Sequence, residues 1–226
     1  NQGSGGTINL ASGAILPLNG TTNAFNATGA STIQNDILGA GTLNVTGGTT
    51  TVAATGNVAT ATTIGASGTV VNNGIMAGVS NAGSFTNNLT AGALTNTGAG
   101  TGSNSGTLAS LTHNSSGLFD NAATGIVTGA STVSAGDVTN SGEFSSTLGV
   151  TAGTFTNSVG AKVIGTTTIT GTGAVTNSGS MAAVTNGVSY TATSTATTGA
   201  LTNTGTASIT GGTTASVINN AALATT

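Results

Sequence analysis

The sequence predicts an all-β protein whose fold is a parallel β-helix, or β-solenoid, with coils of about 17–20 residues. Three observations lead to this prediction: an unusual composition, a turn motif that recurs along the chain, and short segments in which apolar and polar residues alternate. Residues 1–226 are expected to form a single solenoid domain or a fragment of a longer one.

The composition excludes both an ordinary globular core and a disordered chain. Of the 226 residues, 38 are glycine, while 2% are charged and 3% are aromatic. Disordered chains combine low hydrophobicity with high net charge, whereas here 36% of the residues are hydrophobic and the formal net charge is −3. The apolar residues are mostly Ala, Val, Ile and Leu, spread evenly along the chain. A long, thin core is therefore expected.

A turn motif, in which an apolar residue precedes Thr-Asn-Ser/Thr-Gly, recurs along the chain. Looser copies begin at Phe85, Phe155 and Val184. Asparagine and glycine adopt the backbone conformations that tight corners require, so the motif is expected at a corner of each coil. The four full copies are Leu94–Gly98, Val138–Gly142, Val175–Gly179 and Leu201–Gly205.

The asparagines of the motif set the expected coil length. Successive members of the clearest run, at positions 121, 140, 157 and 177, are 19, 17 and 20 residues apart. Asn203 follows only after 26 residues, which predicts a longer coil or a loop near residues 190–195. Upstream, Asn87 and Asn104 continue with a spacing of 17, but Asn96 and Asn114 fit a competing register. The amides are expected to stack as a structural ladder at one corner, formed by Asn121, Asn140, Asn157, Asn177, Asn203 and Asn219.

Within one coil, the alternation of apolar and polar residues predicts three short strands. They are expected at residues 142–146, 148–151 and 154–156. A period of two indicates a strand with one buried face, and the abundance of Thr, Gly, Asn, Ser and Val disfavours a helix.

Stacking such coils about 4.8 Å apart pairs each strand with its copy in the next coil. The chain length then gives roughly 11 to 13 coils. Like charges repeated at this spacing would repel one another, which explains why charged residues are rare, whereas Thr and Ser stack without this penalty. The open ends of such a rod are adhesive edges unless they are covered.

The charged residues exclude several classes of partner. The chain has one lysine, Lys162, and neither arginine nor cysteine. A single cation cannot form the basic cluster that binds nucleic acid or anionic lipid, and disulfides and thiolate metal sites are impossible. No apolar run is long enough to span a bilayer, so no membrane insertion is expected of this segment. The N-terminus has no secretion signal, which we expect to have been removed or to lie outside the fragment.

The candidate catalytic and metal-binding residues are few. A glycan-cleaving site needs two carboxyl groups across a groove. Among Asp36, Asp120, Asp137 and Glu143, Asp120 and Asp137 are expected to point outward from adjacent coils, two residues apart in register. His113 is expected in an exposed turn, because its neighbours supply no further ligands. We therefore expect no enzyme activity, no catalytic residue, no cofactor and no metal.

Segments such as Gly41–Gly48 and Gly65–Ile75 resemble the passenger domains of bacterial autotransporters and of filamentous-haemagglutinin-like adhesins. The resemblance rests on repeat texture and covers nearly the whole chain. It implies a right-handed parallel β-helix on the bacterial outer surface, exported through an outer-membrane barrel and acting in adhesion, aggregation or biofilm formation. The chain departs from these families in its very low charge, and no barrel follows Thr226 in this sequence.

Two functions are expected first: a cell-surface structural or adhesive rod that associates with itself or with a neighbouring cell, and a filament subunit that stacks end to end. A glycan depolymerase is less favoured. The threonine runs at residues 49–51, 166–170 and 191–198 also suggest an ice-binding surface. Such a surface needs threonines at one coil position, and these runs are not expected to recur at one.

Overall fold

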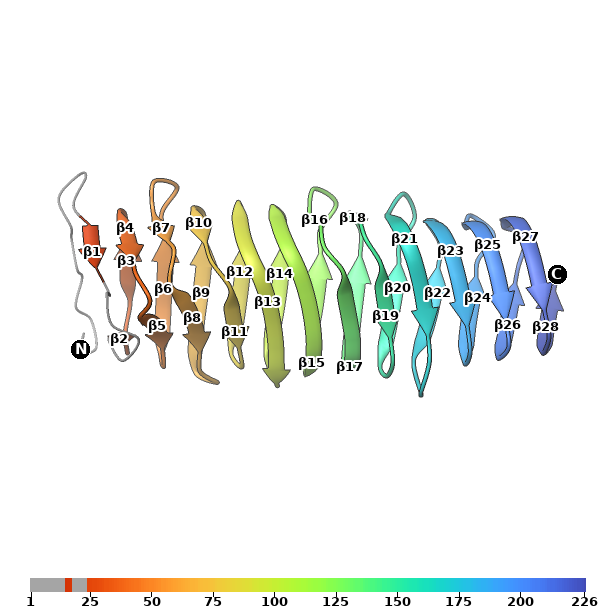
Figure 1. The fold of residues 1–226 in the computed structure, drawn as a ribbon, viewed down its shortest axis with the longest axis horizontal. Coiled ribbons are helices and arrows are strands. Elements are labelled where there is room, and N and C mark those ends of the chain that lie inside the picture. Colours follow the sequence, from red (N-terminus) through yellow and green to blue (C-terminus); the bar gives the residue numbers. More distant parts are fainter. Residues whose placement is uncertain (1–14, 18–23) are drawn as a thin grey trace.

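The computed structural model describes residues 15–17 and 24–226 and is an all-parallel β-solenoid of about 12 turns. Figure 1 shows the coils following one another along the long axis from the N-terminal to the C-terminal end. The described residues contain strands and no helix. The predicted fold class and number of coils are therefore confirmed, whereas the right-handed coiling stays a prediction.

Each coil contributes a strand segment to three sides, which we call side 1, side 2 and side 3 in chain order. The strands confined to side 1 are β1 (Ile15–Pro17), β4 (Asp36–Leu38), β7 (Asn57–Val58), β10 (Ile75–Met76), β16 (Ile126–Val127) and β18 (Glu143–Phe144). The strands confined to side 2 are β2 (Ala24–Ala27), β5 (Thr42–Val45), β8 (Ala61–Ile64), β11 (Val79–Asn81) and β19 (Leu148–Val150). The strands confined to side 3 are β3 (Ser31–Ile33), β6 (Gly48–Val52), β9 (Gly68–Asn72), β12 (Ser84–Asn87), β14 (Thr101–Asn104), β20 (Thr154–Asn157), β22 (Ala174–Asn177), β24 (Ser189–Ala192), β26 (Thr206–Ile209) and β28 (Ala222–Thr225).

Seven longer strands continue around a corner. Strand β17 (Ser131–Asn140) covers sides 2 and 3, and β15 (Thr107–Asn121) covers all three sides. Sides 1 and 2 share β13 (Thr90–Gly98), β21 (Lys162–Ile169), β23 (Ser180–Asn186), β25 (Thr197–Asn203) and β27 (Thr213–Asn219). In the coil for which three strands are predicted within residues 142–156, β18, β19 and β20 lie at the predicted positions.

The coils differ in length more than the sequence predicts. Residues paired between adjacent coils are 15 positions apart at Asn72 and Asn87 but 21 positions apart at Leu16 and Ile37. The strands keep their register because the corners between them take up the difference. This variation hides the repeat from a fixed-period reading of the sequence.

The core is a set of columns that run along the axis. In strand β20, Thr154 and Thr156 point outward, while Phe155 and Asn157 are buried. Phe155 also contacts Phe144 of side 1 edge to face, with ring centroids 5.4 Å apart. Because one inward residue per strand stacks on its copies above and below, apolar burial continues along the rod. The inward column of side 1 contains Ile37, Val58, Met76, Ala91, Leu108, Val127, Phe144, Val163 and Met181.

Glycine at the corners permits both a positive φ and a close approach between coils. A comparison of two glycines distinguishes the two effects. Gly98 (φ +60°) and Gly153 (φ +75°) both adopt the left-handed conformation. A Cβ at Gly98 would meet nothing within 4 Å, whereas one at Gly153 would lie 2.2 Å from the carbonyl oxygen of Gly136. We expect Gly98→Ala to lose about 1–2 kcal/mol of unfolding free energy. Gly153→Ala should lose clearly more in urea titrations, and equal losses would contradict the close-approach argument.

Candidate functional site

The most extensive polar feature of the interior is a ladder of buried asparagine side chains on side 3. We call it the side 3 ladder. From Asn72 to Asn157, each Nδ2 donates a hydrogen bond of 2.7–2.9 Å to the Oδ1 of the asparagine in the next coil. Its members are Asn72, Asn87, Asn104, Asn121, Asn140, Asn157 and Asn177.

Asn140 shows why asparagine suits this position. Its Nδ2 donates to Oδ1 of Asn157 at 2.8 Å and to the carbonyl oxygen of Lys162 at 3.1 Å. Its Oδ1 accepts from Nδ2 of Asn121 at 2.8 Å and from the backbone N–H of Gly142 at 3.2 Å. Two donors and two acceptor sites are thus all used, which satisfies a fully buried amide.

A steric constraint at the same corner explains why the turn motif ends in glycine. A Cβ on Gly142 would lie 2.2 Å from the carbonyl oxygen of Gly125 in the preceding coil. The backbone N–H two residues after the asparagine therefore approaches Oδ1 without a side chain in the way. The Thr-Asn-Ser/Thr-Gly motif is thus a corner in which the asparagine side chain turns inward.

Side 2 contains a second, interrupted ladder. Asn81 donates to Asn96 at 3.0 Å, and the column continues to His113. Val133, Val150 and Ile169 then occupy the same inward position. The column returns to asparagine at Asn186, Asn203 and Asn219, which are linked by two hydrogen bonds of 2.7 Å.

The six asparagines of the predicted ladder consequently divide between two ladders. The structure brings Asn121, Asn140, Asn157 and Asn177 together on side 3, but it places Asn203 and Asn219 on side 2. The single-ladder grouping is wrong because the same turn motif occurs at two different corners. This also resolves the competing registers, since Asn87 and Asn104 belong to side 3 and Asn96 to side 2.

The 26-residue gap before Asn203 is not a longer coil or a loop. Residues 189–192 form strand β24, which pairs with β22 in register. Ala192 takes the ladder position opposite Asn177. The amide of Asn177 instead donates to the Tyr190 hydroxyl at 3.2 Å and to Oγ1 of Thr198 at 3.3 Å, so the side 3 ladder ends against a buried tyrosine.

His113 is fully buried, and the prediction of an exposed turn residue is wrong. It occupies an inward position of β15, where its Nδ1 lies 3.2 Å from Nδ2 of Asn96 and its Nε2 lies 3.0 Å from the carbonyl oxygen of Gly117. Burial lowers the pKa of His113 below its ordinary value, opposed by the hydrogen bond to Gly117 and by the Asp137 carboxylate. The imidazole therefore replaces an asparagine amide in the side 2 ladder.

The carboxylates are dispersed along the rod. As the register predicts, Asp120 and Asp137 project from adjacent coils of side 3, with Leu118 as the residue opposite Asp137. Asp137 accepts a hydrogen bond from the Thr154 hydroxyl. On side 1, Glu143 is paired in register with Lys162. Within residues 15–17 and 24–226, no group of three or more His, Cys, Asp or Glu residues could hold a metal ion.

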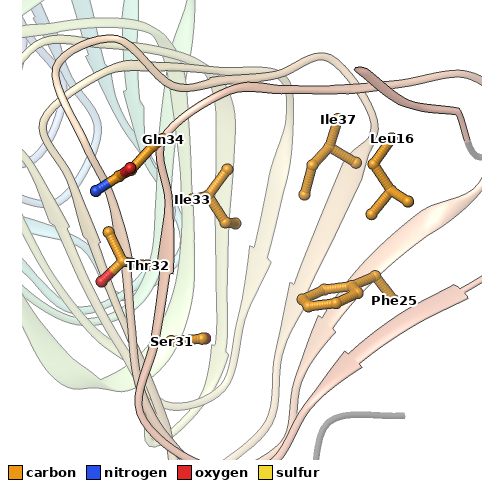
Figure 2. A pocket seen from close by; sticks show the side chains of 7 residues that line it. All are labelled: Leu16, Phe25, Ser31, Thr32, Ile33, Gln34 and Ile37. Atoms are coloured by element: carbon orange, nitrogen blue, oxygen red, sulfur yellow. The ribbon is translucent and has the colours of Figure 1, made fainter. Parts of the chain in front are cut away.

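Two hollows in the described part of the chain were considered as binding sites. Figure 2 shows an apolar one at the first coils, where Leu16, Phe25 and Ile37 face one another. Its volume of ≈ 20 Å³ has room for about one water molecule. An open hollow of ≈ 280 Å³ at the corner before side 1 is lined by Glu143, Lys162 and the neighbouring turns. Neither combines enclosure with convergent polar groups.

The sequence reasoning missed ladder members on both sides. Asn72 and Asn81 each have a glycine two residues later, which is the feature that leaves room for the inward amide at Gly142. A search for Asn-x-Gly, without the preceding threonine, would have found them. Asn87 and Asn104, which continue the predicted spacing upstream, are members of the side 3 ladder by their register.

The fold and its ladders define a class, the all-parallel β-solenoid with buried asparagine ladders. No protein-family model, curated protein or solved structure matches the chain. Among residues 15–17 and 24–226, no helix is long and apolar enough to cross a membrane.

Proposed function

We propose that the protein is a structural or adhesive rod on a bacterial cell surface, which acts in adhesion, aggregation or biofilm formation without a catalytic site. The observation that carries the proposal is the recurrence of outward threonine and serine side chains from coil to coil in a solenoid of about 12 turns. Function is then distributed over many weak contacts between the rod and a second rod or a neighbouring cell.

Three further points support this proposal. The texture of residues 41–48 and 65–75 resembles that of secreted adhesin passengers. The interior ladders hold the coils in register without disulfides, through packing and hydrogen bonds between coils. The outward positions of side 3 are mainly threonine and serine, which can make many similar hydrogen bonds with a neighbouring surface.

Beads coated with the folded 226-residue chain provide the test. We expect them to aggregate, or to adhere to bacterial cells, more strongly than beads coated with an unrelated neutral protein. Single outward substitutions such as Thr95→Ala should weaken binding only slightly, because the contacts are distributed. Absence of adhesion and aggregation would contradict the proposal, as would complete loss of binding from one carboxylate change such as Asp137→Asn.

An end-to-end filament subunit is the second candidate. Val217 of β27, in the last described coil, occupies an inward column and is 42% exposed. Electron microscopy of the same preparation separates the two candidates. Filaments whose length grows with concentration would support end-to-end stacking, whereas uniform short rods at every concentration would exclude it.

A further inference from the structure

Outward-facing hydroxyl groups recur at two positions of side 3, which we call the hydroxyl array. The two positions lie on either side of one inward residue, as Thr154 and Thr156 lie on either side of Phe155. The first column contains Thr49, Thr69, Ser84, Thr101, Thr154, Ser189 and Thr206. The second contains Thr32, Thr51, Thr86, Ser103, Thr139, Thr156, Thr176, Thr191 and Ser208.

This recurrence corrects the expectation that threonines do not return to one coil position. The runs at 49–51 and 191–198 each contribute to the same columns of side 3, through Thr51 and Thr191. The recurrence is hidden in the sequence because the coils vary in length while the strands stay in register.

The array has two regular repeats. The backbones of adjacent coils are about 4.7–4.9 Å apart, and the two columns are about 6.6 Å apart along the strand. Hydroxyl groups can depart from the backbone spacing: Ser103 Oγ donates a hydrogen bond to Thr86 Oγ1 of the adjacent coil at 3.3 Å. Threonine is stiff at χ1, and the strand beneath is fixed by buried residues such as Phe155 and Asn157, so the spacing is held rigidly.

Within residues 15–17 and 24–226, side 3 alone has hydroxyl groups recurring in both outward columns. On side 2, an outward hydroxyl column also exists, with Thr168 and Thr185 as neighbours. The position two residues earlier is instead often small and without a hydroxyl, as at Ala183 and Ala200. Side 2 therefore offers a single row, whereas side 3 offers a two-dimensional lattice.

We propose that the hydroxyl array of side 3 binds ice. Both repeats lie close to those at which oxygen atoms recur on the faces of ice crystals. Each hydroxyl can donate one hydrogen bond and accept two, while the threonine methyl groups restrict the positions of the bridging water molecules. The residues of the array are uncharged. Water molecules at the array are therefore not held in the tight hydration shell that surrounds a charged group.

One coil interrupts both columns of the array, and single positions without a hydroxyl occur at Val71 in the second column and at Ala174 in the first. At the two outward positions, strand β15 carries Leu118 and Asp120 in place of hydroxyl residues, and the next coil carries Asp137 opposite Leu118. The array is thereby divided into an N-terminal part, which includes Thr86 and Ser103, and a C-terminal part, from Thr139 to Ser208. Each part is smaller than the whole side, so joining them should strengthen binding.

The test measures inhibition of ice recrystallisation and partition into growing ice, with the folded 226-residue chain. The unsubstituted chain should inhibit recrystallisation and enter the ice. Thr156→Lys and Thr191→Lys should abolish both effects, because a charged, longer side chain breaks the lattice. The matched control on side 2, Thr185→Lys, should keep them. The double variant Leu118→Thr with Asp120→Thr should increase inhibition, because it joins the two parts of the array along the second column, although Asp137 still interrupts the first.

Several outcomes would overturn the proposal. A folded chain, checked by circular dichroism, that neither inhibits recrystallisation nor enters ice would do so. Equal losses from Thr156→Lys and Thr185→Lys would show that side 3 is not the binding face. Should the lysine variants fail to fold, the double threonine variant still decides the question, since unchanged or weaker inhibition contradicts the lattice. The bead assay is independent of these results.

Discussion

Replacing Asn140 by alanine is expected to reduce the unfolding free energy by about 3 kcal/mol. Four hydrogen bonds are lost in the buried interior, two donated by Nδ2 and two accepted by Oδ1. The groups left behind include Oδ1 of Asn157 and the N–H of Gly142, which no water can reach without opening the coil. The cost of leaving such groups unpaired exceeds that of losing the bonds alone. Urea unfolding followed by circular dichroism measures the change.

Asn114→Ala is the matched control for this experiment. Asn114 lies in the same fold but points outward from β15 and is exposed. An exposed substitution of this kind is expected to change the stability by no more than about 0.5 kcal/mol. Similar effects of Asn140→Ala and Asn114→Ala would mean that the ladder contributes little to stability.

Acidification is expected to destabilise the rod through His113. Nδ1 of the neutral ring accepts from Nδ2 of Asn96, so the proton is on Nε2 and is donated to the Gly117 carbonyl. A second proton on Nδ1 would face the amide donor of Asn96. That amide cannot simply turn over, because its Oδ1 already accepts from Asn81 at 3.0 Å.

The sign of the pH dependence follows from the lowered pKa of His113, which results mainly from burial. Above the unfolded value of about 6.5, the ring is neutral in both states and the full stability is present. As the pH falls below it, the unfolded chain takes up the proton first, so stability decreases until the lowered folded pKa is passed. The steepest expected loss is about 1.4 kcal/mol per pH unit.

His113→Asn tests this prediction directly, because it places an amide at a position where the neighbouring coil already has Asn96. Urea midpoints should fall between pH 7.5 and pH 5 for the unsubstituted chain and stay nearly constant for the variant. A variant that loses stability in parallel with the unsubstituted chain would show that His113 is not the cause of the pH dependence.

The sequence was sufficient for the fold because the same alternation appears in every coil. Strands β18, β19 and β20 could be located from Phe144, Val150 and Phe155, each an apolar residue between polar ones. The coil-to-coil register could not be obtained in this way. Because the corners differ in length, paired residues of adjacent coils are 15 to 21 positions apart in the sequence. The number of residues between Asn177 and Asn203 therefore does not show that they lie on different sides of the solenoid.

The polar interior was harder to predict than the strands. The polarity of histidine favours a surface position, and the sequence near His113 contains no side-chain partner for its ring. The partner, Asn96, lies in the previous coil, where it holds the donor that the ring requires. Likewise, Tyr190 is buried because Asn177 and Thr198 satisfy its hydroxyl from other coils.

The hydrogen bonds of both ladders run in one direction along the rod. From Asn72 to Asn177 and from Asn186 to Asn219, Nδ2 always belongs to the earlier coil and Oδ1 to the later one. The amide dipoles therefore add along the axis and give the interior an electrical polarity. A coil brought up in the reverse orientation would set donor against donor or acceptor against acceptor. The ladders are consequently satisfied only when neighbouring coils have the same orientation along the axis.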